Sequence, residues 1–390
     1  MTPPLNHRKV RTKVPLGGPS ARPAHEHLFN GDLLMSDSDL NFARSQFAEI
    51  SHLLDDERLR AVFAQYEAEG NAARDHVRRL GLGAVLFATL ALLTIATQPA
   101  WPYTPTARWI AVILESGGMF AALVASGGLW LGPWKQRWLE SRLMTERLRQ
   151  WHFQLWLRRG REIDASVGGT KAVAEFQNKR ERWLDEFLKS HEGQLDAKLQ
   201  SLTSELGDTD MWLHSSPTAY PDKSKALPHV FQAYEKLRFD HQYSYALHKL
   251  RRADDTPIWR FLRWPAIRQA STLSALASVG LSAALVCSAA LIYAHAFRSG
   301  NHLEPTFRMG AIVAALVGLA LRTLQEGLAP EEETERYNDY RARIAQLRER
   351  FQGTNDQNQR LRIMEDLERA AFDELRGFLR THRRARFLLT

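Results

Sequence analysis

Residues 80–97 read LGLGAVLFATLALLTIAT, eighteen consecutive residues without a charged side chain. A helix needs about 20 mostly apolar residues to cross the hydrocarbon core of a bilayer, with a range of about 17 to 25. The stretch therefore predicts a transmembrane helix. The alternative is a buried hairpin of a water-soluble protein, and an uncharged run of this length disfavours it.

Three further apolar runs meet the same condition. They are residues 109–131, 271–297 and 307–321. The first of them holds a single charge, Glu115, and the second is uncharged as far as His295. The last is short, with Arg308 and Arg322 near its two ends, where long side chains can extend to the membrane surfaces. The chain is therefore predicted to span a membrane four times, in two hairpins.

Lysine and arginine near the span ends predict the orientation. Basic residues such as Arg79, Lys135, Arg268 and Arg322 lie on the outer flanks of the two hairpins, whereas the two short connections carry only Arg298. Because cytoplasmic flanks carry the excess of basic residues, both termini and the long middle segment are predicted to be cytoplasmic. The protein is thus expected to be a multi-pass protein of the inner (cytoplasmic) membrane.

The segments outside the spans have the pattern of amphipathic helices. Apolar residues recur at three- and four-residue spacing, and no alternating strand pattern competes, so the fold class is predicted to be all-α. The helical segments are residues 39–80, 138–159, 170–206, 229–252 and 331–351. The expected domains are a disordered basic tail (1–34), a first two-span unit (35–160), a helical connector (161–228) and a second two-span unit (229–390). Met35 is an alternative translation start, which would remove the tail.

Composition and motifs narrow the function classes. The chain has 390 residues, a net charge of +8 and one cysteine, Cys287, which excludes a disulfide framework. We find no phosphate-binding lysine motif, no nucleophile elbow and no paired-ligand metal motif, so no enzyme, cofactor or metal is predicted. His241 and His248 are expected to be surface histidines. With four spans, the basic charge indicates an anionic membrane surface and not a nucleic-acid partner.

The two hairpins share an order of features that indicates an internal duplication. PTAR at 105–108 and PTFR at 305–308 each open the second span of a hairpin. An amphipathic helix precedes each hairpin and a charged helix follows it, in which Trp138 aligns with Tyr337. Two tandem copies of one unit are the first interpretation. The alternative is two independent hairpins that obey the same membrane rules.

The flanks of the hairpins resemble the SLATT superfamily, the SMODS- and SLOG-associating two-transmembrane effector domains. The resemblance is carried by short motifs before and after the hairpin, over about half of the chain. The matching positions are Tyr234, Arg238, Asp240, Gln242 and Tyr245 before a hairpin, and Trp138, Arg142, Glu146 and Leu148 after one. The second copy departs from the pattern, with Ala345 in place of the acidic residue.

This resemblance implies a function. Such domains are membrane effectors of bacterial conflict systems, including antiphage defence, and a nucleotide-signalling partner protein triggers them to form a pore as oligomers. A non-conducting scaffold that anchors a cytoplasmic signalling partner is the alternative. Arg142 and Glu146 stand four residues apart, so they are expected either to pair on one helix or to dock a partner or anionic headgroups.

Polar residues inside the spans are the candidate functional residues. Glu115 is predicted to line or gate a pore, because an intramembrane charge is costly and faces a bundle interior, a partner or water. The alternative is a protonated carboxyl, or one paired with an arginine such as Arg308. Ser274, Ser278 and Ser282 form a hydroxyl stripe, which is expected either to bond to another helix or to line an aqueous path.

Small residues at four-residue spacing predict close helix packing and self-association. The packing candidates are Gly117, Gly118, Ala121, Ala122, Gly310 and Gly318. The residues predicted to mark the span boundaries are Arg108, Arg308 and Arg322.

Overall fold

The computed structural model of the chain describes residues 30–101, 104–204, 211–214, 217–250, 264, 266–296 and 304–387. Within these ranges the protein is helical and contains no named strand, which confirms the predicted all-α class. The α-helices are α1 (Asp37–Gln46), α2 (Ser51–Leu54), α3 (Glu57–Thr97), α4 (Pro105–Leu131), α5 (Trp134–Arg158), α6 (Gly160–Ser166), α7 (Thr170–His191), α8 (Leu195–Thr203), α9 (Leu227–Tyr234), α10 (His241–Leu250), α11 (Ala266–Ala296), α12 (Glu304–Leu328), α13 (Pro330–Gly353) and α14 (Gln357–Arg384).

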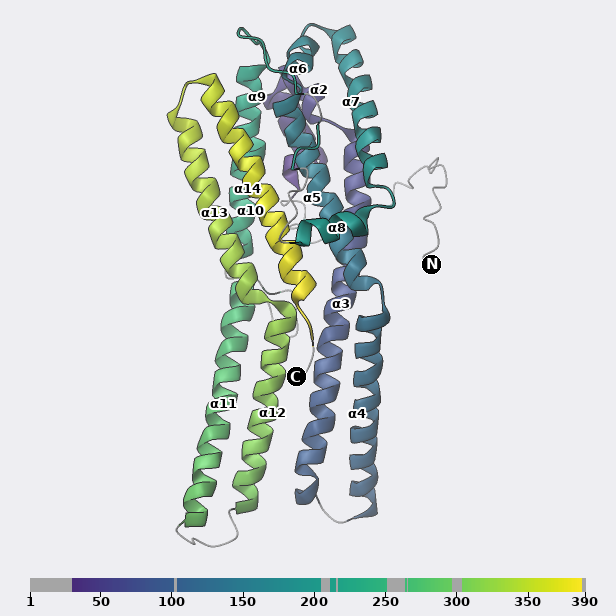
Figure 1. Cartoon of the computed structure of the whole chain (residues 1–390), viewed down its shortest axis with the longest axis vertical. Helices are drawn as coiled ribbons and strands as arrows, with labels where there is room; N and C mark the ends of the chain where they lie inside the picture. The colour runs from purple at the N-terminus through teal and green to yellow at the C-terminus, as the bar shows by residue number, and fades with distance from the viewer. Residues whose placement is uncertain are drawn as a thin grey trace.

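Four helices of the described chain are long and apolar enough to cross a membrane, as the sequence predicts: α3, α4, α11 and α12. α3 packs along α4 and α11 along α12, and α12 also packs against α3. The four candidate spans therefore lie in a row with α4 and α11 at its ends (Figure 1). The remaining helices form a helical domain at one end of this row, and α3 runs unbroken from that domain into its span.

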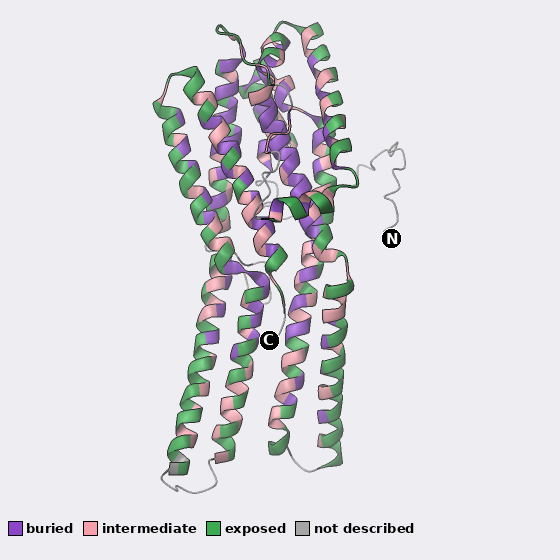
Figure 2. Cartoon of the chain, viewed as in Figure 1, coloured by how far each residue is buried: buried purple, intermediate pink, exposed green. Residues whose placement is uncertain are grey.

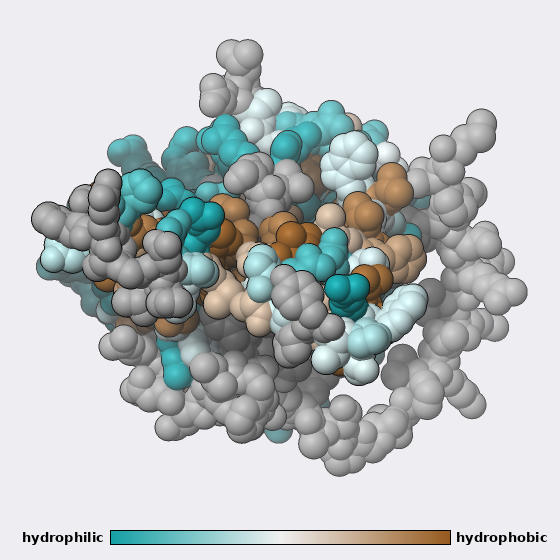
Figure 3. Space-filling model, turned by 90° about the horizontal axis from the view of Figure 1, so that it is seen from below, coloured by the Kyte–Doolittle hydropathy of each residue, from teal (hydrophilic) through white to brown (hydrophobic). Residues whose placement is uncertain are grey.

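The surface of the four spans is apolar. All but two of the large hydrophobic side chains that are exposed in the described chain lie on α3, α4, α11 or α12. Figure 2 shows the contrast between these exposed helices and the buried interior of the helical domain. Apolar side chains also reach the surface at the end of the molecule opposite that domain (Figure 3). Lipid tails, which have the polarity of such side chains, are the solvent that this surface fits.

A proline break ends the second helix of each pair. Gly132–Pro133 separates α4 from α5, and Ala329–Pro330 separates α12 from α13. Proline suits the first turn of a helix because it lacks the N–H that would have no partner there. Ala329 has a φ of 48°, so the chain turns sharply between the span and the helical domain.

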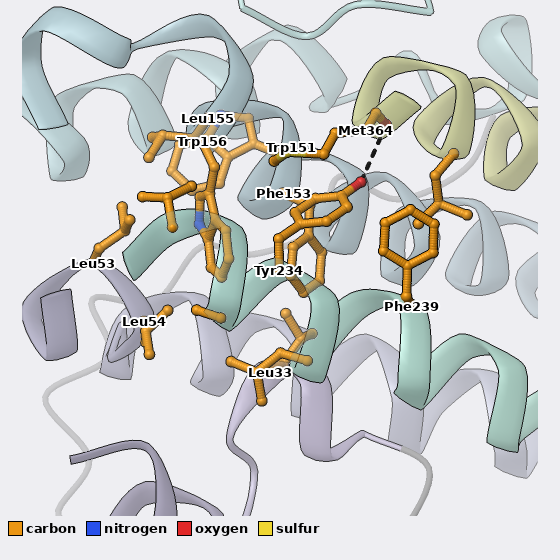
Figure 4. Packing of buried hydrophobic residues seen from close by; sticks show 14 of the residues in the cluster. Leu33, Leu53, Leu54, Trp151, Phe153, Leu155, Trp156, Tyr234, Phe239 and Met364 are labelled. Carbon is orange, nitrogen blue, oxygen red and sulfur yellow. Dashed lines mark hydrogen bonds between the residues drawn. The ribbon is translucent and has the colours of Figure 1, made fainter. Parts of the chain in front are cut away.

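α5 forms the centre of the helical domain. Its side chains Trp151, Phe153 and Trp156 are at most 1% exposed and pack against Tyr234 and Leu33 (Figure 4). The core takes buried side chains from the N-terminal residues, from α7 and from α13 and α14. The expected units 35–160, 161–228 and 229–390 therefore share one hydrophobic core, and the expected connector contributes to it through α7.

The expected boundary of the N-terminal tail is wrong. Residues 30–34 are folded: Asp32, Leu33 and Leu34 are each 1% exposed, inside the helical domain. A tertiary contact holds these residues in place: Asp32 forms an ion pair with an arginine of α5 that lies more than a hundred residues away in the sequence. Residues 1–29 lie outside the described ranges.

The expected helix over residues 39–80 is interrupted before α3. Asp56 caps α3 by accepting a hydrogen bond from the backbone N–H of Leu59. Arg180 of α7 pairs with Asp56 at 3.0 Å and donates to the backbone carbonyls of His52, Leu53 and Asp55, at the end of α2. The buried Arg180 side chain thus stabilises the interruption between α2 and α3.

Candidate functional site: a buried ionic network between the two halves

Three acidic and three basic side chains meet inside the helical domain, where α5 faces α10, α13 and α14. We call these residues the ionic network: Asp32, Arg142, Glu146, Arg149, Arg238 and Glu368. Their formal charges cancel. The network joins the N-terminal residues and α5, from the first half of the chain, to the π-helical turn between α9 and α10 and to α14, from the second half.

Arg238 and Glu368 form the deepest pair. The guanidinium group donates two hydrogen bonds to the carboxylate, at 2.8 and 3.0 Å, and both side chains are at most 1% exposed. The Tyr234 hydroxyl donates to the same carboxylate at 2.8 Å, and the guanidinium lies over the ring of Phe153. Such a bidentate pair fixes the orientation of both side chains and places their opposite charges in contact.

A π-helical turn places Arg238. Residues Glu235–Asp240 form this turn between α9 and α10. A π-turn holds one more residue than an α-turn, so it shifts the side chains that follow around the helix axis. Arg238 and Gln242 then both face the network.

Asp32 connects the deep pair to α5. Its carboxylate lies 2.9 Å from Nε of Arg149 and 3.8 Å from the Arg238 guanidinium, with the side chain fully buried. Gln242 Nε2 donates to it at 3.2 Å, and Nε2 of His241 lies 3.6 Å away. The expectation of a surface position for His241 is therefore wrong, because its side chain is only 14% exposed.

Glu146 continues the network along α5. Arg149 pairs with it at 2.7 Å and Arg142 at 2.9 Å. Burial alone would raise the pKa of the Glu146 carboxyl, but these two guanidinium groups lower it to about 2. The Arg142–Glu146 pair that the spacing predicts is thus formed, as part of a larger buried array and not as an isolated surface pair.

A second cluster lies where the helical domain meets the spans, and we call it the boundary cluster: Arg336, Glu333, Glu374 and His382. Arg336 lies 3.1 Å from Glu374, and His382 Nε2 lies 3.0 Å from Glu333. Burial lowers the pKa of His382, which favours the neutral ring as a donor to Glu333. Burial raises the pKa of Glu333 by itself, yet the hydrogen bond from His382 and the charge of Arg336 bring it well below its usual range.

The structure brings the predicted motif residues together. Tyr234, Arg238 and Gln242 contact Glu368 or Asp32, and Tyr245 lies with its hydroxyl 3.5 Å from that of Tyr337. Trp138 packs edge-to-face on Phe378, next to the boundary cluster. Residues more than 90 positions apart in the sequence thus share one site.

The network residues that sequence reasoning missed are Asp32, Arg149 and Glu368. It also missed Tyr340, which lies beside the network and donates to Gln242 at 3.2 Å. Glu368 carried a signal: it stands one turn after Met364 and one turn before Phe372, both buried, where the helical repeat expects an apolar side chain. Asp32 carried none, because it lies in a segment interpreted as a tail.

Glu115 lies on the face of α4 that packs against α3. Ala111 and Gly118, one turn away on either side, are buried there, and Glu115 itself is half-buried. It has no ion-pair partner among the residues that the structure describes. The alternative pairing with Arg308 is wrong, since Arg308 pairs with Glu304 of its own helix at 3.0 Å.

The other predicted boundary residues are exposed. Arg108 lies at the start of α4, and Arg322 is 68% exposed beside Glu326, 3.7 Å away on the same helix. Both positions fit the ends of an apolar helix.

Of the predicted packing residues, four lie at helix contacts. Gly118 faces the backbone carbonyl of Phe87 on α3, Gly310 faces Cys287, and Gly318 faces Leu281 and the neighbouring Gly280. Ala122 is buried on the same face as Gly118. Gly117, in contrast, faces open space and Ala121 is only half-buried. The face of α4 that carries Gly117 is thus open at that position among the described residues, whereas Ala125, two turns further along, is buried.

Among the described residues, the serines of the α11 stripe form no hydrogen bond with α12. Ser278 and Ser282 are exposed, and Ser274 is half-buried. The face of α11 that packs on α12 includes Ala277 and Gly280 instead. Hydrogen bonding of the stripe to a second chain, or its lining of an aqueous path, stays a prediction.

Among the described residues, no three His, Cys, Asp or Glu side chains lie close enough to hold a metal ion. Comparison with protein-family models, with curated proteins and with solved structures finds no match to this chain.

Proposed function

We propose that this chain is an effector of the bacterial inner membrane, with both termini in the cytoplasm, that permeabilises the membrane as an oligomer. A nucleotide-signalling partner protein would activate it from the cytoplasmic side. The resemblance of its flanking motifs to SLATT domains supports the class of function. The two-hairpin arrangement and the tandem duplication are part of this proposal.

The observation that carries the proposal is the open row of spans. α4 and α11 lie at the ends of the row and expose most of their surface, so the described spans form an open row and not a closed ring. Polar and small side chains lie on these outer helices: Ser278 and Ser282 are exposed, and Gly117 faces open space among the described residues. Small and hydroxylated faces are the contacts that membrane helices use to associate. An oligomer would bring such faces together.

Glu115 supports a role in conduction. It is a half-buried carboxyl without an ion-pair partner in the described chain, on a helix whose other faces are apolar. Leaving a carboxylate unpaired within a bilayer costs at least about 2.5 kcal/mol at the centre of a helix. Water in an assembled pore would solvate it, and this reduces the cost.

The test is the membrane potential of cells that express the protein. Induced expression, with or without a candidate partner, is expected to depolarise the cells, and Glu115→Gln is expected to change the extent of depolarisation, because it removes an intramembrane charge. Glu326→Gln is the matched control, because Glu326 is an exposed acid at the end of α12. An unchanged potential in every condition, at equal membrane abundance, contradicts the proposal.

A non-conducting scaffold is the second candidate, and the ionic network favours it, because its ion pairs join the two halves of the chain within one core and such a core suits a rigid platform. The scaffold predicts that a cytoplasmic partner co-purifies with the full chain and that Glu115→Gln changes neither binding nor potential. The full chain is needed, because residues of the first half share their core with α13 and α14.

A further inference from the structure

The C-terminal segment leaves the helical domain and reaches the spans. α14 ends at Arg384, and the side chain of Phe387 then lies between α3 and α12. A methyl group added to Gly81 of α3 would lie 2.6 Å from ring carbons of Phe387, and one added to Gly327 of α12 would lie 2.2 Å away. The ring therefore occupies space that two glycines leave free, one on each helix.

This position is the meeting point of the two span pairs. Phe387 packs with an apolar cluster built from the spans, which includes Val85 of α3 and Leu324 and Leu328 of α12. α3 and α12 are the helices through which the two pairs contact each other. Among the described residues of this cluster, Phe387 is the only one that lies outside α3, α11 and α12.

Two anchors hold the segment in place. The Lys135 ammonium group, at the start of α5, donates to the backbone carbonyls of Arg383 at 3.0 Å and Ala385 at 2.7 Å. Arg383 in turn donates to the Thr203 hydroxyl of α8. Burial, together with the charges of Arg386 and Arg383, lowers the pKa of Lys135 to about 8, which reflects how far this ammonium is removed from water.

The glycines give an independent argument. Glycine inside a helix is less favourable than alanine by about 1 kcal/mol. Gly81 stands inside α3, whereas Gly327 is the second-last residue of α12, and a Cβ at either position would meet the ring. The ring contact therefore offsets the cost of glycine at Gly81.

We propose that the C-terminal segment is a built-in wedge: Phe387 sets the separation of α3 and α12 where the spans join the helical domain, and its withdrawal lets the two span pairs rearrange. Without the ring, the glycine faces can approach each other, as small-residue faces do in membranes. A change in the helical domain that moves α14 or Lys135 thereby reaches the spans. The effect on membrane potential rests on the proposed function, whereas the effect on helix separation does not.

The separation can be measured with spin labels at exposed positions 79 and 326, next to the two glycines, in a Cys287→Ala background. Phe387→Ala and Lys135→Gln are each expected to shorten the distance between the two labels by at least about 1–2 Å, which is the scale of helix shifts. A second population of molecules in which this distance is shorter by that amount would be the equivalent result. Trp130→Ala is the control, because it removes a 90% exposed ring from α4. An unchanged distance in both Phe387→Ala and Lys135→Gln overturns the wedge.

Glycine substitutions test the same cavity by thermal stability. Gly327→Ala is expected to lower the melting temperature by expelling the ring, whereas Gly127→Ala, which faces open space, is expected to be neutral or stabilising. Equal stabilisation by both substitutions overturns the wedge. If the distance shortens and the membrane potential stays unchanged, the wedge stands and the proposed conduction fails.

Discussion

At the scale of single residues, the helical domain depends on charges that it buries as ion pairs. Arg238 and Glu368 are at most 1% exposed, and each satisfies the other through two hydrogen bonds. Desolvating such a pair offsets much of its attraction, but removing one partner leaves a charge buried without compensation. The consequence of a substitution therefore depends on whether the pair is broken or replaced as a whole.

Glu368→Ala is expected to destabilise the protein by about 3–5 kcal/mol, because Arg238 and Tyr234 lose their common partner. The double substitution Arg238→Met with Glu368→Leu is expected to recover most of this loss. Thermal unfolding in detergent or nanodiscs, followed by circular dichroism, measures both. The control is Asp373→Asn, whose pair with Arg343 is about half exposed and should contribute less than about 1 kcal/mol. An equal loss in the single and double variants would refute the compensation.

At the scale of elements, the segment of residues 30–34 behaves as part of the core. It forms a short 3-10 turn whose Asp32 is the carboxylate shared by Arg149 and Arg238. The preceding Asn30 accepts a hydrogen bond from Arg149 at 2.8 Å. A turn of this length has little intrinsic stability, so its tertiary contacts determine its structure.

A chain that begins at Met35 is therefore expected to be less stable than one that begins at residue 30. The loss should be at least about 3 kcal/mol, since Arg149 remains buried without Asp32. Comparing deletions of residues 1–29 and 1–34, by yield and by melting temperature, measures the difference. Asp32→Asn in the full chain should reproduce a large part of it. Indistinguishable melting of the two deletions would show that this turn contributes nothing.

At the scale of the whole molecule, acid should destabilise the helical domain in two steps. Burial lowers the pKa of His152 to about 3 and those of His191 and His214 to about 4, from an ordinary 6.5. The unfolded chain binds these protons first, so stability falls as pH drops below about 6.5, by about 1.4 kcal/mol per pH unit for each histidine. Glu146, with a pKa of about 2, adds a further loss below its ordinary 4.5.

Unfolding measured between pH 7.5 and 4 checks this expectation. His152→Phe should reduce the number of protons that the chain takes up on unfolding by about one, because it removes one buried imidazole that must stay neutral. The free energy of unfolding should therefore change less steeply with pH. His248→Phe is the control, since His248 is exposed on α10. A pH dependence of unfolding that is the same in the wild type and in His152→Phe would contradict the assignment.

The four apolar helices and the all-α class follow from the sequence alone. The condition is local, since a helix that crosses a membrane must cover about 30 Å of hydrocarbon whatever its neighbours are. The predicted spans therefore end close to the observed helices: 80–97 ends with α3 at Thr97, and 109–131 ends with α4 at Leu131. The packing faces of Gly118 and Gly318 follow from the same local spacing.

The roles of the charged residues come from tertiary contacts. Asp32, Glu146 and Glu368 lie on three segments whose sequences are those of surface helices or a tail, and they acquire their roles from arginines brought to them by the fold. Phe387 likewise gains its place because two glycines 246 residues apart face each other across α3 and α12. Membrane insertion depends on the composition of one continuous stretch. A buried ion pair or a wedge depends on segments that are distant in the sequence, and sequence periodicity describes only a continuous stretch.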